Sequence, residues 1–261
     1  WNACLAIIGG NSVIWKPSSQ TPLCAIAIHE LCMDVMNELK TPNIFSLIIT
    51  ESHDAALPLL TSNQVKLVSF TGSCRQGKEI ARLVHQRLGK TLLELGGNNA
   101  IIIDESANID LALDHVYFGA IATSGQRCTS TRRVFIHQQH HDAFLTALRQ
   151  RYQGIQIDDG LAPSCQLGPL INQTAIDNYI NAIDAIKKAK GKIYFGGKII
   201  NRPGYFVEPT LVQDLNHDSA IVQQETFVPI LYLFPFSNIQ EAIRMQNDVP
   251  QGLSSALFTQ N

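Results

Sequence analysis

Cys128 lies in the segment SGQRCTS (124–130), in which small residues surround the thiol. A cysteine nucleophile needs room for its substrate, backbone N–H groups close by and a positive charge that favours the thiolate. Gly125 and Thr129 leave such room, and Arg127 supplies the charge. A buried structural thiol is the commoner role of a cysteine taken at random. The segment therefore predicts a nucleophile, with a structural thiol as the alternative.

A carboxylate that could act as the base is Glu94, in the segment LLELGGNN (92–99). It ends an apolar run directly before two glycines, and carboxylates at the carboxyl ends of strands in α/β folds point into the ligand crevice. Such a glutamate acts as a general base when partial burial disfavours its charged form. The alternative is a solvent-facing glutamate on an edge strand, with Gly96 and Gly97 needed only for a turn.

The segment SFTGSCRQGKEI (69–80) runs from a strand-like stretch through Gly72 and Ser73 into a helical pattern. Free N–H groups at the start of such a helix bind phosphate. The spacing is neither GxGxxG nor a P-loop, and a serine that only caps the helix explains the segment equally well.

Two further segments place polar side chains beside predicted strands. In VIWKPSSQTP (13–22), Lys16 ends a strand, where its ammonium could bind a ribose hydroxyl or a phosphate; a solvated lysine is the alternative. In QQETFVP (223–229), Glu225 and Phe227 lie in a loop just before a core strand.

Short β-branched runs alternate with longer amphipathic stretches along the chain, which predicts βαβ units and a parallel sheet. The predicted strands are 11–15, 44–49, 65–70, 91–95, 100–103, 133–137, 228–234 and 253–259, and the predicted helices are 22–39, 75–88, 109–123, 140–152, 173–188 and 239–247. Gly96 and Gly97 are the clearest break in the pattern of strands and helices, and they predict a domain junction between residues 1–95 and 96–261.

Composition narrows the class of protein. Of the 261 residues, 45% are hydrophobic but only 16% are charged, below the roughly 25% of an average soluble domain. This favours central parallel strands covered on both faces, and surface hidden by other protein. The net charge of −2, without a block of like charge, predicts no nucleic-acid partner and no anionic membrane partner. No apolar run approaches the ~18 residues of a membrane helix.

The six cysteines show no CxxC spacing, which predicts neither a metal site nor a disulfide framework and favours a reducing, cytoplasmic compartment. The start, WNACLAIIGGNSVIW, is apolar but lacks the basic region of a signal peptide. Because native N-termini are usually polar, it predicts that the chain begins inside a core element, as in a shortened sequence.

Together and in this order, five segments resemble the aldehyde dehydrogenase superfamily, over Trp1–Asn261 but only the middle of a family chain. WKPSSQTP is similar to the family's nucleotide-ribose segment, FTGS to its pyrophosphate helix and ELGG to its general-base motif. GQRCT is similar to its nucleophile motif and ETFVP to its nicotinamide-ribose motif. The resemblance implies an α/β fold in which residues 1–95 are the C-terminal part of a Rossmann-like NAD-binding domain. Residues 96–261 would be a shortened catalytic domain.

Four segments are most similar in sequence to the antiquitin branch of the superfamily: ELGGNNAII, SGQRCTSTRR, RPGYFVEPT and QGLSSALFT. Enzymes of that branch oxidise α-aminoadipic semialdehyde, which is in equilibrium with piperideine-6-carboxylate, in lysine catabolism. The resemblance therefore implies a small-molecule aldehyde as substrate and a homodimer or homotetramer for the full-length protein.

By the resemblance, Cys128 attacks the aldehyde to give a thiohemiacetal and then a thioester, and Glu94 activates the water that hydrolyses it. The residues expected to hold the cofactor are Lys16, Gly72, Ser73, Leu95, Glu225 and Phe227. NAD⁺ is expected, with NADP⁺ as the alternative, because no arginine lies in the Lys16 turn to clamp a 2′-phosphate. Arg127 and Thr129 are expected to bind the far end of the substrate; alternatively, Arg127 pairs internally and braces the loop.

Two departures from the family's pattern stand out. Ser19 replaces a glutamate common three residues after the family's lysine, which leaves the selectivity for the adenosine ribose open. The stretch TESHDAA (50–56) lacks glycines often seen where the family's helix approaches the cofactor, so Ala55 and Ala56 are expected to pack there instead.

Other functions stay open at the level of the sequence. They are a CoA-acylating or general aldehyde dehydrogenase, and an inactive shortened paralogue that acts as a binding partner. Glu94 counts against the acylating enzyme, because hydrolysis needs a base. The family's oxyanion asparagine would lie before Trp1, so the isolated 261-residue chain is expected to be inactive.

Overall fold

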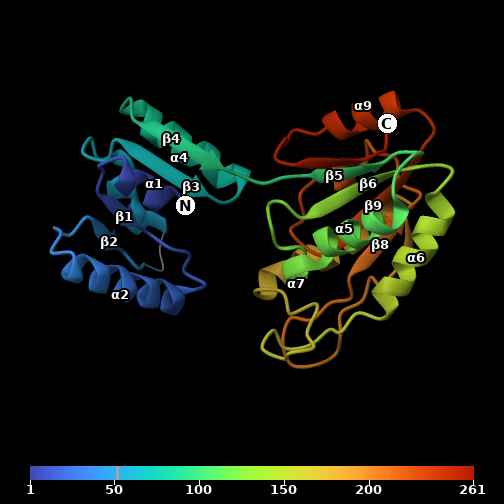
Figure 1. Cartoon of the computed structure of the whole chain (residues 1–261), viewed down its shortest axis with the longest axis horizontal. Helices are drawn as coiled ribbons and strands as arrows, with labels where there is room; N and C mark the ends of the chain where they lie inside the picture. Colours follow the sequence, from blue (N-terminus) through green and yellow to red (C-terminus); the bar gives the residue numbers. More distant parts are fainter. Residues whose placement is uncertain (51–52) are drawn as a thin grey trace. The chain divides into compact units, whose positions relative to one another are not determined.

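The structure, a computed structural model, describes residues 1–50 and 53–261. The chain divides into two compact units, Trp1–Leu95 (unit 1) and Gly96–Asn261 (unit 2). Both units combine parallel strands with helices (Figure 1), which confirms the predicted α/β class. Among the described residues, no helix is both long and apolar enough to cross a membrane.

Unit 1 holds two pairs of parallel strands, and the predicted strands and longer helices of this unit are found within about two residues of their expected limits. Its elements are α1 (Asn2–Ile8), β1 (Val13–Trp15), α2 (Pro22–Glu38), β2 (Phe45–Leu47), η1 (His53–Ala56), α3 (Leu57–Thr61), β3 (Leu67–Thr71), α4 (Cys74–Gln86) and β4 (Lys90–Glu94). Strand β1 pairs with β2, and β3 with β4. Helices α1 and α3 were not predicted, since neither has a side-chain cap that marks its start.

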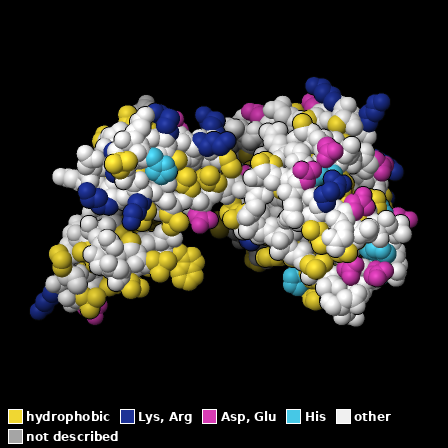
Figure 2. All heavy atoms as spheres, turned by 90° about the horizontal axis from the view of Figure 1, so that it is seen from above, with side chains coloured by type: hydrophobic (Ala, Val, Ile, Leu, Met, Phe, Trp, Pro, Cys, Tyr) yellow, Lys and Arg dark blue, Asp and Glu magenta, His cyan; other side chains and the backbone are white. Residues whose placement is uncertain are grey.

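Few side chains of unit 1 are buried. His29 of helix α2 packs on Phe45 of β2, with the ring centroids 5.8 Å apart, and the Phe45 ring lies 5.9 Å from that of Trp15 in β1. The N-terminal segment is helix α1, and none of its seven residues is buried. Trp1 is 98% exposed within the described chain. The expectation that the chain begins inside a core element concerns a longer protein and stays a prediction. Figure 2 shows hydrophobic side chains over the surface of this unit, on the left of the view.

The expectation for TESHDAA falls partly on residues 51–52, which lie outside the described residues. Of the two alanines, Ala55 is exposed and Ala56 is half-buried at the end of η1.

Unit 2 is built on one six-stranded sheet in the order β10-β5-β6-β9-β8-β7, with all neighbours parallel except β7 and β8. Its strands are β5 (Asn99–Ile103), β6 (Thr131–His137), β7 (Lys192–Phe195), β8 (Thr210–Gln213), β9 (Ile230–Phe236) and β10 (Ser255–Phe258). Its helices are α5 (Ile109–Ile121), η2 (Ala122–Gly125), α6 (His141–Gln153), α7 (Gln173–Lys188), α8 (Ala220–Gln223) and α9 (Ile239–Asn247).

Helices cover both faces of this sheet. Because successive side chains of a strand point to opposite faces, Ile101 and Ile103 pack with α5 and α6, whereas Ala100 and Ile102 pack with α7, α8 and α9. The two clusters make β5, β6 and β9 almost completely buried. The low charged fraction of the sequence thus corresponds here to strands covered on both faces.

Strands β7 and β8 and helix α8 were not predicted. Each spans only four residues, too few for a clear period. The burial of β8 follows from its place between β7 and β9 in the sheet, which is a tertiary contact and not a local pattern.

Candidate active site

The loop before Cys128 is a left-handed turn. Helix α5 ends at Ile121, and then Thr123, Ser124 and Gly125 all have positive φ, at 55°, 54° and 69°. Such φ values are strained for residues with a Cβ. A Cβ on Gly125 would lie 2.7 Å from the carbonyl carbon of Val228, so only glycine fits there. Strained backbone of this kind is typical of functional sites.

The Cys128 loop contacts residues 97–99, which follow Glu94 in the sequence. Asn99 Nδ2 donates hydrogen bonds to the carbonyl oxygens of Cys128 (2.7 Å) and Ser130 (2.8 Å). A Cβ on Gly97 would lie 2.5 Å from the Cys128 oxygen, so Gly97 is required by close approach and not only by a turn. Cys128 itself is half-buried. Among the described residues, no acceptor takes its backbone N–H, which is free to stabilise an oxyanion.

Arg127 and Thr129 are both exposed beside Cys128. The Nε of Arg127 donates to Thr123 Oγ1 (2.8 Å), and its guanidinium carbon lies 5.7 Å from the ring centroid of Phe118. Arg127 therefore braces the loop through one nitrogen, and no carboxylate of the described chain forms an ion pair with it. Its remaining donors are accessible to a ligand.

Glu225 and Phe227 precede β9, as predicted. Glu225 Oε1 accepts from the Gly97 N–H (3.1 Å) and lies 3.5 Å from Nη2 of Arg132. Phe227 has a φ of 57° and is 41% exposed, and the Arg132 guanidinium lies over its ring at 5.5 Å. Unit 2 thus brings three segments together in one cluster. They are the Cys128 loop, the glycine pair Gly96 and Gly97, and the turn that carries Glu225 and Phe227.

Asn99 and Arg132 were not singled out from the sequence. Both are nearly completely buried, and burial of polar or charged side chains is uncommon. The signal that could have found them is polar residues in otherwise apolar strands, NN before AIII and RR before VFI.

In unit 1, Glu94 ends β4, opposite Thr71 at the end of β3. The N–H of Gly72 donates to the Glu94 carbonyl (3.0 Å), which places Gly72, Ser73 and Leu95 together at the carboxyl ends of the two strands. Glu94 is exposed, so the described chain does not supply the partial burial expected of a general base.

Ser73 is the N-cap of α4, and its side chain accepts from the Gln76 N–H (3.2 Å). The other N–H groups of the first turn have no partner within an α-helix. Lys16 directly follows β1, and its Nζ donates to the Pro17 carbonyl (3.1 Å).

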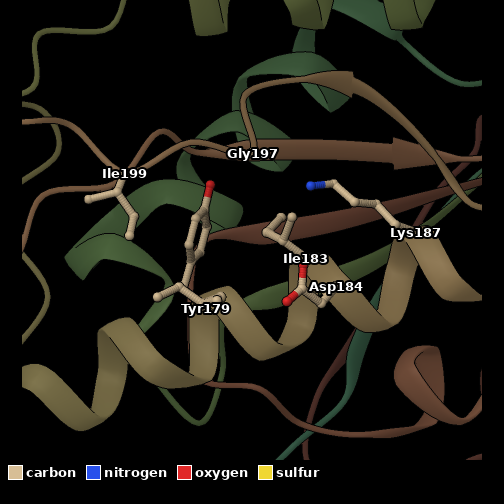
Figure 3. A pocket seen from close by; sticks show the side chains of 7 residues that line it. Tyr179, Ile183, Asp184, Lys187, Gly197 and Ile199 are labelled. Carbon is tan, nitrogen blue, oxygen red and sulfur yellow. The ribbon is translucent and has the colours of Figure 1, made fainter.

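A separate hollow of about 170 Å³ lies beside α7. Figure 3 shows Tyr179, Ile183 and Lys187 of α7 reaching toward the segment that carries Gly197. None of its lining residues is a predicted site residue, and the Tyr179 hydroxyl is already bonded to Thr210 Oγ1 (2.7 Å).

Comparison with known proteins gives a consistent picture. The model of the aldehyde dehydrogenase family matches residues 1–261. The chain is 41% identical over 260 residues to the aldehyde dehydrogenase family 7 member A1 of Pisum sativum, and covers 51% of that protein. It is 40% identical over 261 residues to the α-aminoadipic semialdehyde dehydrogenase of Mus musculus, and covers 48% of it. All of the chain is aligned in both cases, so it spans about half the length of these relatives.

A solved structure agrees with the sequence matches. The betaine aldehyde dehydrogenase of Staphylococcus aureus, as a point mutant in complex with NAD⁺, superposes with a TM-score of 0.90 at 32% identity. The alignment covers 96% of this chain and 51% of the other. The family match over the full chain, together with this structural similarity, shows that the chain belongs to the aldehyde dehydrogenase family.

Proposed function

We propose that the protein oxidises an aldehyde to a carboxylic acid with NAD⁺, using Cys128 as the nucleophile and Glu94 as the base. The observation that carries the proposal is the Cys128 loop, where a half-buried thiol follows a strained left-handed turn and its own N–H is left free while its carbonyl is bound by Asn99. Family membership supports the same reaction.

In this proposal, residues 1–95 are the C-terminal part of an NAD-binding domain and residues 96–261 belong to the catalytic domain. The first turn of α4 fits a phosphate, because its N–H groups and the helix dipole favour an anion beside Gly72 and Ser73. The other residues proposed to hold the cofactor are Lys16, Leu95, Glu225 and Phe227. A relative whose structure contains NAD⁺ supports the choice of cofactor.

The steps follow from the groups present. The Cys128 thiolate adds to the carbonyl carbon, and the resulting oxyanion accepts a hydrogen bond from the Cys128 N–H, a contribution of about 3 kcal/mol in comparable sites. Bound NAD⁺ supplies the hydride acceptor, and loss of hydride leaves a thioester on Cys128. Glu94 then takes a proton from water, the hydroxide attacks the thioester, and the carboxylic acid leaves as the thiolate is restored.

α-Aminoadipic semialdehyde is the proposed substrate, supported by the name of the mouse relative. Its far end carries a carboxylate, which the accessible donors of Arg127 suit, and Thr129 could add a hydrogen bond. A site built for a charged tail rejects an uncharged one, because its polar groups would stay unpaired.

The test is kcat/KM of the full-length protein for this semialdehyde and for hexanal, with NAD⁺ and with NADP⁺. We expect hexanal to be poorer by about 10² or more, and Arg127→Ala to narrow the gap. Equal rates for both aldehydes would contradict the substrate, a tenfold preference for NADP⁺ would contradict the cofactor, and no reduced cofactor with any aldehyde would contradict the reaction.

We also propose that the full-length protein forms a homodimer or homotetramer in a reducing, cytoplasmic compartment. The exposed apolar side chains of unit 1 support burial against other protein surface, and the six free cysteines support the compartment. Light scattering of the purified protein measures the oligomeric state, and a monomer at all concentrations would refute that part.

A further inference from the structure

Arg132 is a buried cation at the centre of the cluster in unit 2. It lies in β6 and is 2% exposed. Burial of a guanidinium is unfavourable unless hydrogen bonds and an opposite charge compensate for the lost water. Its Nε and Nη2 meet three backbone carbonyls, those of Gly97 (3.4 Å), Gly125 (3.3 Å) and Arg127 (3.0 Å).

The same guanidinium reaches the turn before β9. Nη2 lies 3.5 Å from Glu225 Oε1, and the guanidinium carbon lies 5.5 Å from the Phe227 ring. Burial lowers the pKa of Arg132, and the Glu225 carboxylate acts in the opposite direction. A single side chain therefore contacts the nucleophile loop, the glycine pair after Glu94 and the Glu225 turn.

We propose that Arg132 is a positioning residue, which holds the strained Cys128 loop and the Glu225 turn in place for the reaction. The inference rests on the proposed function, since it takes Cys128 as the nucleophile and Glu225 as a cofactor contact. Thr123 and Ser124 stay in the left-handed region only while their surroundings hold them there. The bonds from Arg132 to the carbonyls of Gly125 and Arg127 fix the end of that turn.

The geometry requires arginine. A guanidinium presents five N–H donors in a planar, rigid fork, whereas a lysine ammonium is a compact charge that cannot meet carbonyls on several sides. Its neighbour Arg133 points to the other face of β6, where Nη1 contacts the Met245 carbonyl (2.9 Å) and His217 Nε2 (2.9 Å). Arg133 is equally buried and also donates to the Asn98 carbonyl (2.6 Å), but no hydrogen bond among the described residues joins it to the Cys128 loop or to the Glu225 turn.

The test measures amide hydrogen exchange in the full-length protein, in peptides covering 122–130, 223–229 and, as a reference, α7. In Arg132→Gln we expect at least tenfold faster exchange in the first two peptides and unchanged exchange in α7. The proposed function adds that kcat should fall by about 10²-fold, because small misplacements of reacting groups have effects of that size. Arg132→Lys should restore neither property.

The outcomes separate the two proposals. Unchanged exchange in 122–130, or an equal rise in α7, would overturn the positioning role. If Arg132→Gln does not fold, Arg132→Lys keeps the charge and is read by the same criteria. Glu225→Gln is the matched control, expected to loosen 223–229 but not 122–130. Local loosening in a protein that oxidises no aldehyde would refute the proposed function and leave the positioning of the loop intact.

Discussion

Unit 2 buries its apolar side chains on both faces of one continuous sheet, whereas unit 1 carries two separate pairs of strands and leaves many apolar side chains exposed. The exposed residues of unit 1 include Trp1, Leu5, Ile8, Leu23, Leu31, Val35, Leu39 and Leu88. The Cys128 loop is fixed by groups within unit 2, chiefly Asn99 and Arg132. The proposed nucleophile is therefore positioned by its own unit.

Unit 1 differs because its site residues stand at the ends of half-buried strands. Glu94 is exposed and ends a strand whose residues alternate between exposed and half-buried. The backbone sets the position of polar groups at such strand ends. Their burial and contacts depend on the protein surface that covers the exposed faces of these strands. The comparison thus predicts that a substitution in unit 2 affects its own surroundings in that unit. The effect of a substitution in unit 1 depends on what covers unit 1 in the full-length protein.

The largest expected effect is the loss of the Cys128 thiol. In the full-length protein, Cys128→Ala should abolish aldehyde oxidation and any ester hydrolysis, a drop of about 10⁴-fold or more, because no covalent intermediate can form. The measurement is reduced cofactor formed per unit time. Cys165→Ala removes another half-buried thiol of unit 2 and should leave the rate unchanged. Near-normal turnover of Cys128→Ala would show that Cys128 of unit 2 is not the nucleophile.

Removal of the Glu94 carboxylate should have a somewhat smaller effect. Glu94→Gln should slow turnover by about 10²–10⁴-fold, because water is no longer deprotonated. A thioester on Cys128 should then accumulate and be visible as a mass increase after one burst of reduced cofactor. Glu79→Gln, an exposed carboxylate of α4 paired with Arg82, is the control and should turn over normally. If Glu94→Gln gives neither burst nor adduct, Glu94 acts earlier or not at all.

Core truncations test the packing difference directly. Leu231 of β9 is 0% exposed, so Leu231→Ala should lower the free energy of unfolding by about 2–5 kcal/mol. Leu67 of β3 is 52% exposed, so Leu67→Ala should change it by less than about 0.5 kcal/mol. Urea unfolding with hydrogen exchange resolved by unit gives both values. A large loss for Leu67→Ala would show that the full-length protein covers this face of unit 1.

A weaker effect concerns acid stability of unit 2. His217 is 5% exposed, and its Nε2 lies 2.9 Å from Nη1 of Arg133. Burial and the Arg133 charge lower the pKa of His217, while the carboxylates of Asp218 and Asp248 act in the opposite direction. Burial also lowers the pKa of Arg133 to about 10, so Arg133 stays charged at neutral pH. A protonated His217 is therefore disfavoured in the folded protein.

The sign of the pH dependence follows from the lowered pKa. The unfolded chain takes up a proton at the ordinary histidine pKa of about 6.5, but the folded chain does so only at lower pH. The stabilisation is complete above about pH 6.5 and is lost as the pH falls through the folded pKa. We expect Tm to fall on acidification, and His217→Gln to reduce that fall. The exposed His115 is the control, and an equally reduced fall in His115→Gln would contradict the assignment.

The sequence alone determined most of the helices and strands and the family. Glu94 was placed at a strand end before Gly96, and β4 ends at Glu94. Helices α7 and α9 have the predicted limits, because their 3.6-residue pattern and their asparagine caps are local signals. Motif order was sufficient to predict the family to which the chain belongs.

Only the tertiary structure decided which residues hold the Cys128 loop in place. A turn was one of the alternatives that the sequence left for Gly97, but Gly97 is required because the Cys128 carbonyl oxygen lies 2.5 Å from the position of a Cβ. Asn99 lies 29 residues from Cys128, and Glu225 lies 128 residues from Gly97. Such contacts leave no period or spacing in the sequence. They exist because parallel strands bring distant segments to the same edge of a sheet, where the buried polar groups must find partners.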